Sequence, residues 1–419
     1  MEPTLSQTLI ELGEKAKNAS KELALLGNVE KNKILASIQN GLLENIEEIL
    51  KANEKDMEYA REKGISESLL DRLKLTEERI RDMISAIDVL IQSKDPVGKM
   101  EKMETLDNGL RIGKRTVPIG VLAMIYESRP NVTCDGATLA IKSGNAILLR
   151  GGKEAIHSNK ALVKSIKEGI EKAGHNSDMV GLIEDTTRES SYGLMGLRGY
   201  VDLLIPRGSK GLIQSVVENA KVPTLETGAG NCHVYVDSYG NVEMALKIIE
   251  NAKTSRTGVC NAMESLLIHK DVKDEFYQGL EALIQKHGIK THGDERVREK
   301  MQGILPATEE DYFTEYLDLE MSVAVVDSLE EAIAHIDKYS TGHSEVIVTE
   351  NYENAMMFLD RVDSSCVYVN ASSRFTDGGE FGKGAEIGIS TQKLHARGPV
   401  GLEELTSSKY IVFGNGKIR

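Results

Sequence analysis

The chain has 419 residues, of which 40% are hydrophobic and 28% are charged, so its composition excludes a wholly disordered protein. A net charge of −14, an aromatic content of 5% and the absence of tryptophan argue against a nucleic-acid-binding protein, which needs basic surfaces and stacking side chains. The length exceeds the roughly 250–300 residues that one hydrophobic core supports, so two or three domains are expected.

The N-terminal segment resembles no targeting sequence. Residues 1–17 contain no apolar stretch followed by a small-residue cleavage site. The longest apolar run, residues 117–126, is shorter than the ~20 residues that cross a bilayer. The four cysteines are far apart and form no CxxC pair, which is typical of reduced thiols. We therefore expect a cytoplasmic protein without membrane contacts.

Residues 1–100 are expected to form a layer of helices packed on another element. Leu and Ile recur three and four positions apart in residues 5–26 and 29–60, with Lys and Glu between them. No heptad repeat persists, which disfavours a coiled coil that binds a partner helix.

Two series of short apolar strands and helices follow. Such alternation predicts βαβ units and parallel sheets, with a ligand crevice at the carboxyl ends of the strands. In the first series we expect strands at 116–126, 146–152, 179–184, 201–208 and 222–228, and helices at 135–144, 155–173, 189–197 and 209–220. In the second we expect strands at 233–237, 262–269, 322–327, 344–350 and 366–371, and helices at 242–253, 274–287, 329–339 and 353–361.

The C-terminal part differs from both series. Residues 377–388 are rich in glycine, and residues 402–414 have the pattern of a strand without an obvious local partner. That strand is either an edge strand or an arm that pairs with another subunit. We favour the arm, because exposed sheet edges are usually covered or paired.

Two residues are candidates for chemistry. Cys260 lies in a segment of small and polar residues before a strand, where a thiol can reach a cleft and act as a nucleophile. A buried, inert cysteine is the alternative, and it is our interpretation of Cys134, Cys232 and Cys366, which have apolar neighbours. Glu226 follows an expected strand and precedes a glycine-rich turn, so it could transfer protons, or it could be a capping or solvated carboxylate.

Two glycine-containing loops could bind phosphate. GGKEA at 151–155 and RGSKG at 207–211 each link an expected strand to a helix, which presents helix N-terminal amides to an anion. Ordinary turns also use glycine, so neither loop is specific. The nine histidines are scattered without a metal-ligand spacing, and no metal site is expected.

Four long segments identify a family. Residues 117–155, 222–237, 256–269 and 369–407 resemble the aldehyde dehydrogenase superfamily and, within it, the γ-glutamyl phosphate reductases. The resemblance covers residue 117 to the C-terminus. It implies an aldehyde dehydrogenase-like α/β fold, with two Rossmann-type parallel-sheet domains and a small β oligomerisation arm. The implied parts are an NADPH-binding domain at 1–228 with a short arm segment near 101–115, a catalytic domain at 229–366, a return to the cofactor domain at 367–390, and the arm at 391–419.

The resemblance implies NADPH-dependent reduction of L-glutamyl 5-phosphate to L-glutamate 5-semialdehyde, with release of phosphate, in proline biosynthesis. The reaction would pass through a cysteine thioacyl intermediate. Other readings are an oxidative aldehyde dehydrogenase or an acylating acyl-CoA reductase on the same fold, and a non-catalytic scaffold. The reductase-like region leaves no room for a fused glutamate kinase, so a separate glutamate 5-kinase is a possible transient partner. A homo-oligomer, either a dimer or a tetramer, is also implied.

Carried over by residue, Cys260 matches the nucleophile of the superfamily, and Glu226, 34 positions earlier, matches its carboxylate. The turn ESRPN replaces the usual Trp-Asn-Phe-Pro pattern, which places Ser128 where the superfamily has its oxyanion-hole Asn. Asn131 is the nearby residue with a side-chain amide, so it is the candidate for the side-chain donor of the oxyanion hole. The backbone N–H of Cys260 is the other candidate donor.

The remaining assignments concern ligands. The resemblance places five residues at the cofactor: Arg150 and Lys153 at the adenosine ribose, Gly208 and Ser209 near the pyrophosphate, and Glu315 at the nicotinamide ribose. The loop RGSKG lacks the usual Thr-Gly-Ser pattern. From charge complementarity, Arg129 is a candidate for the departing phosphate, and Arg374 and Asp377 are candidates for the substrate carboxylate and ammonium; a solvated loop face is the alternative.

Overall fold

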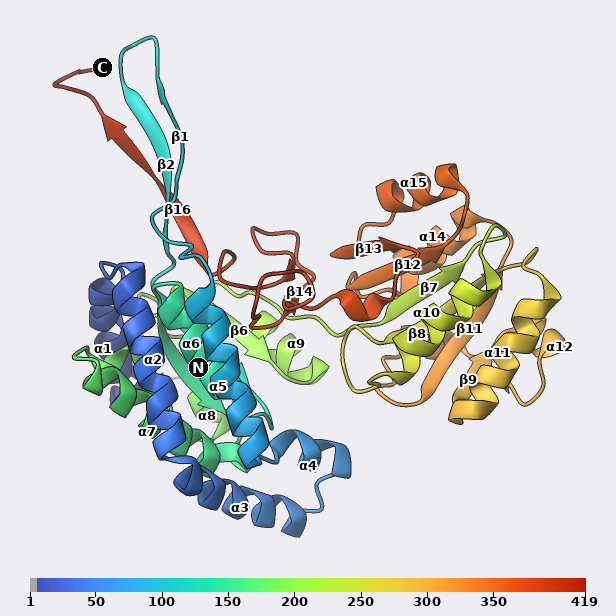
Figure 1. Ribbon diagram of the computed structural model, residues 1–419, viewed down its shortest axis with the longest axis horizontal. Coiled ribbons are helices and arrows are strands. Elements are labelled where there is room, and N and C mark those ends of the chain that lie inside the picture. Colours follow the sequence, from blue (N-terminus) through green and yellow to red (C-terminus); the bar gives the residue numbers. More distant parts are fainter. Residues whose placement is uncertain (1–5) are drawn as a thin grey trace. The chain divides into compact units, whose positions relative to one another are not determined.

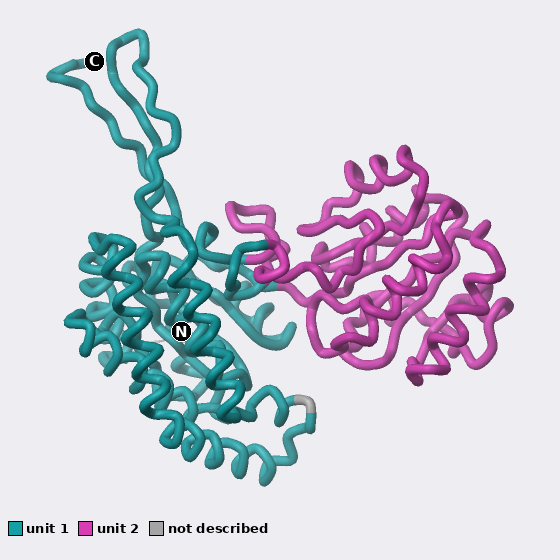
Figure 2. The backbone as a smooth tube through the Cα atoms, viewed as in Figure 1, with its two compact units in different colours: residues 1–227, 382–388, 400–419 teal, residues 228–381, 389–399 magenta. Residues whose placement is uncertain are grey.

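The computed structural model describes residues 6–419, except for the side chain of residue 68. The chain divides into two units (Figure 2). The first contains the chain up to residue 227, together with 382–388 and 400–419. The second contains residues 228–381 and 389–399.

The first unit is built on a parallel sheet of four strands in the order β5-β4-β3-β6. All six residues of β3 are buried, as in sheets that helices cover on both faces. The strands are β3 (Val121–Tyr126), β4 (Ala146–Gly151), β5 (Val180–Leu182) and β6 (Leu203–Arg207). The connecting helices are α6 (Asn131–Lys142), α7 (Ile156–Lys172), α8 (Arg188–Met195) and α9 (Lys210–Asn219).

Between residue 6 and this sheet the structure describes five further helices, in line with the helices that the sequence predicts for residues 1–100 (Figure 1). They are α1 (Gln7–Leu23), α2 (Asn28–Glu44), α3 (Ile46–Glu62), α4 (Glu67–Leu73) and α5 (Glu77–Gln92). Helix α2 packs closely on α7 through two glycines: a Cβ on Gly169 would lie 2.7 Å from Cα of Ile38, and one on Gly41 would lie 2.7 Å from the carbonyl oxygen of Ser165. The helical layer is therefore part of the core of the first unit.

An antiparallel sheet of three strands extends from the rest of the first unit (Figure 1). Its strands are β1 (Met100–Thr105), β2 (Arg111–Pro118) and β16 (Thr406–Phe413), in the order β1-β2-β16. The C-terminal strand has a partner within its own chain, though not a local one, because β16 pairs with the distant β2 along its whole length. We call these three strands the arm.

The second unit contains a parallel sheet of seven strands in the order β10-β9-β11-β8-β7-β12-β13. The strands are β7 (Cys232–Val236), β8 (Met263–His269), β9 (Lys290–Gly293), β10 (Leu305–Pro306), β11 (Glu320–Val326), β12 (Ser344–Val348) and β13 (Cys366–Val369). The helices are α10 (Val242–Thr254), α11 (Asp274–His287), α12 (Glu295–Lys300), α13 (Glu309–Phe313), α14 (Leu329–Tyr339) and α15 (Tyr352–Arg361), with a 3₁₀ turn, η3 (Ser373–Phe375). The short strands β14 (Ile389–Ser390) and β15 (Gly398–Pro399) pair with each other.

Two parallel α/β sheets and a small antiparallel arm confirm the expected fold class. The expected strand at 222–228 is wrong, since this segment makes only an isolated bridge between Thr224 and Leu204. The first expected domain boundary lies within a residue of the division after 227. The return to the first unit comes later than the expected residue 367, because β13 pairs with β12 and stays in the second unit.

No helix among the described residues combines the length and the apolar character needed to cross a membrane.

Candidate functional site

Cys260 lies in the second unit, in the loop at 255–262 between α10 and β8, and it is partly exposed. We call this segment the cysteine loop. It passes directly over Gly230: a Cβ on that residue would lie 1.5 Å from the carbonyl oxygen of Cys260 and 2.7 Å from its Cα. Only glycine fits there, which explains one glycine of the motif ETGAG. The thiol of Cys232 donates a hydrogen bond to the same Cys260 carbonyl at 3.1 Å.

Glu315 and the cysteine loop converge on Gly230. The Gly230 N–H donates to Oε1 of Glu315 at 2.8 Å. Since Gly230 also contacts the backbone of Cys260, the structure brings together two residues that the sequence assigned to different roles.

A turn near the C-terminal end of the second unit holds the cysteine loop. The side-chain amide of Asn261 donates to the carbonyl oxygens of Arg374 and Thr376 at 3.2 and 2.9 Å. The hydroxyl of Ser373 donates back to the Asn261 carbonyl at 2.7 Å. The guanidinium of Arg374 also contacts the loop, through Ser255 and the Asn261 side chain. The sequence did not reveal Asn261, although its position next to the candidate nucleophile was a signal.

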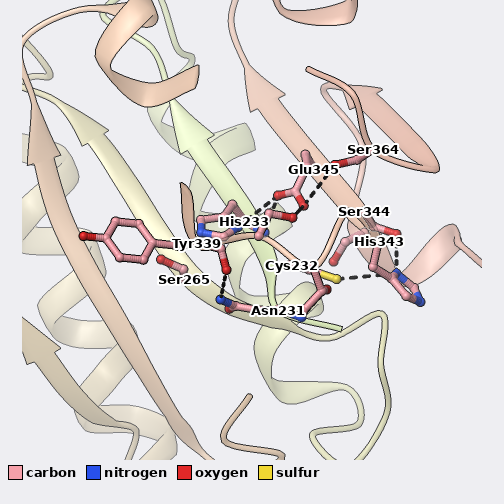
Figure 3. Close-up of polar contacts among 12 residues, drawn as sticks. Asn231, Cys232, His233, Ser265, Tyr339, His343, Ser344, Glu345 and Ser364 are labelled. Atoms are coloured by element: carbon pink, nitrogen blue, oxygen red, sulfur yellow. Dashed lines mark hydrogen bonds and ion pairs between the residues drawn. The ribbon is translucent and has the colours of Figure 1, made fainter. Parts of the chain in front are cut away.

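Buried polar residues at the start of β7 contact others at the start of β12 (Figure 3). His233 lies against Glu345, with its Nδ1 3.1 Å from Oε2, and its backbone N–H donates to the same oxygen at 2.8 Å. The Cys232 thiol is 3.7 Å from Nδ1 of His343. Burial and the negative charge of Glu345 raise the pKa of Cys232 well above its usual value. Cys232, Cys134 and Cys366 are all buried, as expected for inert thiols.

In the first unit, candidate cofactor residues lie at the carboxyl end of β4. Nη2 of Arg150 donates to the carbonyl oxygens of Thr186 and Thr187 at 2.7 and 2.8 Å. Its Nε is buried and has no hydrogen-bond partner among the described residues, and burial lowers the pKa of the guanidinium. Lys153 is exposed in η1 (Lys153–Ala155), the 3₁₀ turn that leads into α7.

The predicted pyrophosphate residues lie where β6 leads into α9. Ser209 is the N-cap of α9, and its side chain accepts from the Leu212 N–H. The Ser209 N–H donates to Oε2 of Glu127 at 2.8 Å, so a carboxylate lies at the N-terminus of this helix. A Cβ on Gly208 would be 2.5 Å from that same oxygen, so this carboxylate needs glycine there. Glu127 was not among the residues predicted from the sequence.

The turn after β3 carries the oxyanion candidates. The backbone N–H and the hydroxyl of Ser128 donate to Oε1 of Glu154 at 2.7 and 2.8 Å. Asn131, in the first turn of α6, donates its amide to Oδ2 of Asp135 at 3.0 Å. Burial raises the pKa of Asp135 to about 6. Arg129 is partly exposed in the same turn, and its carbonyl accepts from the Val132 N–H at 3.0 Å.

Glu226 and Asp377 lie in different units. Glu226 is half-buried in the first unit, and the next residue, Thr227, is fixed to the end of β6 by a 2.7 Å hydrogen bond from its hydroxyl to the Pro206 carbonyl. Asp377, in the second unit, accepts from the Gly379 N–H at 2.8 Å and so caps a local turn.

Comparisons with known proteins identify the family. The model of the aldehyde dehydrogenase family matches residues 7–303 and 321–411. The chain is 54% identical over 405 residues to a γ-glutamyl phosphate reductase of Caldanaerobacter subterraneus, covering 97% of this chain and 98% of the relative. It is 53% identical to that of Clostridium novyi, covering 98% and 99%.

A solved structure agrees with these relatives. The crystal structure of γ-glutamyl phosphate reductase from Thermotoga maritima is 50% identical and superposes with a TM-score of 0.96, covering 98% of this chain and 99% of that one. The chain belongs to the aldehyde dehydrogenase family and, within it, to the γ-glutamyl phosphate reductases.

Proposed function

We propose that the chain reduces L-glutamyl 5-phosphate to L-glutamate 5-semialdehyde with NADPH and releases phosphate, a step of proline biosynthesis. The observation that carries this proposal is the likeness, over nearly the full length, to relatives named γ-glutamyl phosphate reductase. The geometry agrees with it, because Cys260 lies partly exposed on a loop that glycine and Asn261 contacts hold in place.

The carboxyl edge of the four-stranded sheet suits a nicotinamide dinucleotide. At the N-terminus of α9 the Ser209 N–H donates to the carboxylate of Glu127, so the same N–H could donate to a phosphate if the Glu127 side chain moves away. The buried Nε of Arg150 lacks a partner among the described residues and suits an acceptor oxygen. Arg150 and Lys153 would hold the adenosine ribose, Gly208 and Ser209 the pyrophosphate, and Glu315 the nicotinamide ribose. When bound, the cofactor supplies the two electrons and the hydrogen that reduce the acyl carbon.

The chemistry of the chain itself begins at Cys260. Its thiolate attacks the acyl carbon of the acyl phosphate, the C–O bond to phosphate breaks, and a thioester to Cys260 remains. The backbone N–H of Cys260 and the amide of Asn131 would stabilise the developing oxyanion, each donor contributing about 3–4 kcal/mol in comparable sites. After reduction the C–S bond breaks and the thiolate is restored. Glu226 would tune the thiol or carry a proton. No water needs activation, because the thioester is reduced and not hydrolysed, and phosphate is a good leaving group that needs little help from an acid.

The substrate is an anionic amino acid, which calls for complementary charges. We assign Arg374 to its carboxylate, Asp377 to its ammonium group and Arg129 to the departing phosphate. We further propose that the protein works in the cytoplasm as a homo-oligomer, either a dimer or a tetramer, and receives its labile substrate from a separate glutamate 5-kinase.

The reverse reaction tests the proposal. Purified protein is given phosphate, NADP⁺ and glutamate semialdehyde, and NADPH formation is followed by absorbance. We expect activity in the wild type, a loss of at least about a thousandfold in Cys260→Ala, and a loss below about a hundredfold in Glu226→Gln. Turnover with coenzyme A and not with phosphate would instead assign an acylating acyl-CoA reductase. Wild-type turnover in Cys260→Ala would refute the covalent route.

A further inference from the structure

The guanidinium of Arg374 joins the two ends of the cysteine loop. Its Nε donates to the hydroxyl of Ser255 at 3.0 Å, and its Nη1 donates to Oδ1 of Asn261. Ser255 directly follows α10, whereas Asn261 directly follows Cys260. One side chain therefore bridges the beginning of the loop and the residue next to the nucleophile.

The backbone around Arg374 is fixed to the same loop. Asn261 donates to the carbonyl oxygen of Arg374 and Ser373 donates to that of Asn261, so η3 and the loop exchange hydrogen bonds in both directions. Arg374 is itself partly buried. A planar guanidinium with fixed donors orders such a loop better than the flexible, single ammonium group of lysine.

The charge of Arg374 acts on Cys260. Burial and the positive charge of Arg256 lower the pKa of Arg374, whereas Cys260 acts in the opposite direction, which means that a Cys260 thiolate and the guanidinium attract each other. Further ionisable groups near this loop within the second unit are Asp377, which attracts Arg374, and Glu315 at Gly230. The buried Cys232, which donates to the Cys260 carbonyl, is itself near Glu345, Glu264 and His343. Arg256 is exposed, so solvent screens its charge more strongly than that of Arg374.

We infer that Arg374 is a positioning residue that clasps the cysteine loop and stabilises the thiolate of Cys260 before any substrate binds. The inference rests on the proposed function only in taking Cys260 as the nucleophile. Two of the five guanidinium N–H groups hold the loop, which leaves three for the substrate carboxylate. The two roles are separable, since stabilising the thiolate requires no ligand.

Alkylation of Cys260 by iodoacetamide, a neutral reagent, measures this role without substrate or cofactor. The rate constant is followed from pH 5.5 to 10 by mass spectrometry of the peptide that contains Cys260. We expect Arg374→Gln to lower the alkylation rate at pH 7 about tenfold or more. The same variant should raise the midpoint of the pH dependence of this rate by about one pH unit or more. The rates at pH 10, where the thiol is ionised in both proteins, should converge.

Two further variants complete the design. Arg374→Lys keeps the positive charge but loses the two hydrogen bonds to Ser255 and Asn261. The midpoint of its alkylation profile should therefore stay within about half a pH unit of the wild type. Arg256→Gln removes an equal but exposed charge and should move the midpoint by less than half as much as Arg374→Gln. Thermal unfolding of all three variants verifies that they fold.

The outcomes separate this inference from the proposed function. A shifted alkylation profile without reductase activity would support the inference and refute the proposed function. A folded Arg374→Gln variant with the wild-type alkylation profile would overturn the inference. If that variant also lost turnover, the role of Arg374 would be limited to binding the substrate.

Discussion

Lys153 is the residue that most directly bears on the choice of cofactor. It is exposed at the start of the turn leading into α7, where the helix macrodipole disfavours a positive charge. The resemblance to the aldehyde dehydrogenase superfamily implies that NAD-using members commonly have an acidic residue at the matching position, which would bind the adenosine ribose hydroxyls and repel a 2′-phosphate. A lysine there would form a charge-assisted contact with that phosphate, a bond of about 1.5–3 kcal/mol.

We therefore predict that Lys153→Glu shifts the ratio of kcat/KM for NADPH and NADH toward NADH by at least about tenfold, or roughly 1.4 kcal/mol. Steady-state kinetics with both cofactors measure the ratio. Lys15→Glu, an equal change of charge on an exposed position of α1, is the control. If the ratio did not change in Lys153→Glu, Lys153 would not lie at the cofactor.

Other residues of the candidate site could not be found from the sequence. Glu127 reaches the N-terminus of α9, and Glu154 reaches the backbone of Ser128, through contacts between segments that are distant along the chain. Contacts of this kind leave no periodic pattern in the amino-acid sequence. Cys260 and Glu226 were proposed from the sequence because each lies beside small residues next to an expected strand, and their roles stay predictions. The close approach of Gly230 to Cys260 gives a physical reason for one of those glycines.

At the scale of the element, α6 carries a carboxyl group that links stability to pH. Burial raises the pKa of Asp135 from 3.8 to about 6, and its partner Asn131 donates to it in the first turn. The folded protein thus holds this proton more tightly than the unfolded chain does. The contribution of Asp135 to stability is present below pH 3.8 and is lost as the pH rises to about 6.

Asp135→Asn removes this dependence. We predict that the variant gains stability relative to the wild type between pH 4.5 and 7.5, by on the order of 1–2 kcal/mol. Urea unfolding at both pH values measures the difference. Asp107→Asn, at an exposed loop position, should show no comparable gain. An equal difference at both pH values would mean that Asp135 titrates alike in the folded and unfolded chain.

The elements that the sequence predicted best are those with a strong pattern. Helices α11 and α14 have the expected bounds, and β3 and β7 consist of buried residues. Strands β9 and β10 were missed because both are short, and β9 includes Lys290, Thr291 and His292. They form because they pair within the sheet, and not because of their own composition. Residues 222–228 are apolar enough for a strand, yet only Thr224 forms a bridge.

For the molecule as a whole, the candidate residues divide between the two units. The first contains Glu226 and the carboxyl edge with Arg150 and Ser209, whereas the second contains Cys260 and Glu315. The sequence predicted two α/β sheets. It could not predict the partner of the last strand, because β16 pairs with β2 from nearly 300 positions earlier, and only the three-dimensional fold brings them together.

The prediction of an oligomer rests on the arm. A small antiparallel sheet is marginal on its own unless a hydrophobic face is covered. In the arm, Tyr410, Val412 and Phe413 are 70%, 51% and 55% exposed. Strand β16 is also an edge strand of the sheet, so its outer backbone groups have no strand partner among residues 6–419. Both features favour contact with a second copy of the chain.

We predict that the purified protein is a dimer or a tetramer and that Val412→Lys reduces its mass toward that of a single chain. If Val412 lies in the interface, the lysine ammonium group would lose its hydration there. The free-energy cost of that desolvation exceeds what most contacts between exposed side chains contribute to association. Light scattering coupled to size-exclusion chromatography at low micromolar concentration gives the mass. Ser407→Lys, on the same strand at an exposed position that is already polar, should keep the wild-type mass. A monomeric wild type, or a Val412→Lys variant of unchanged mass, would show that this part of the arm does not join the subunits.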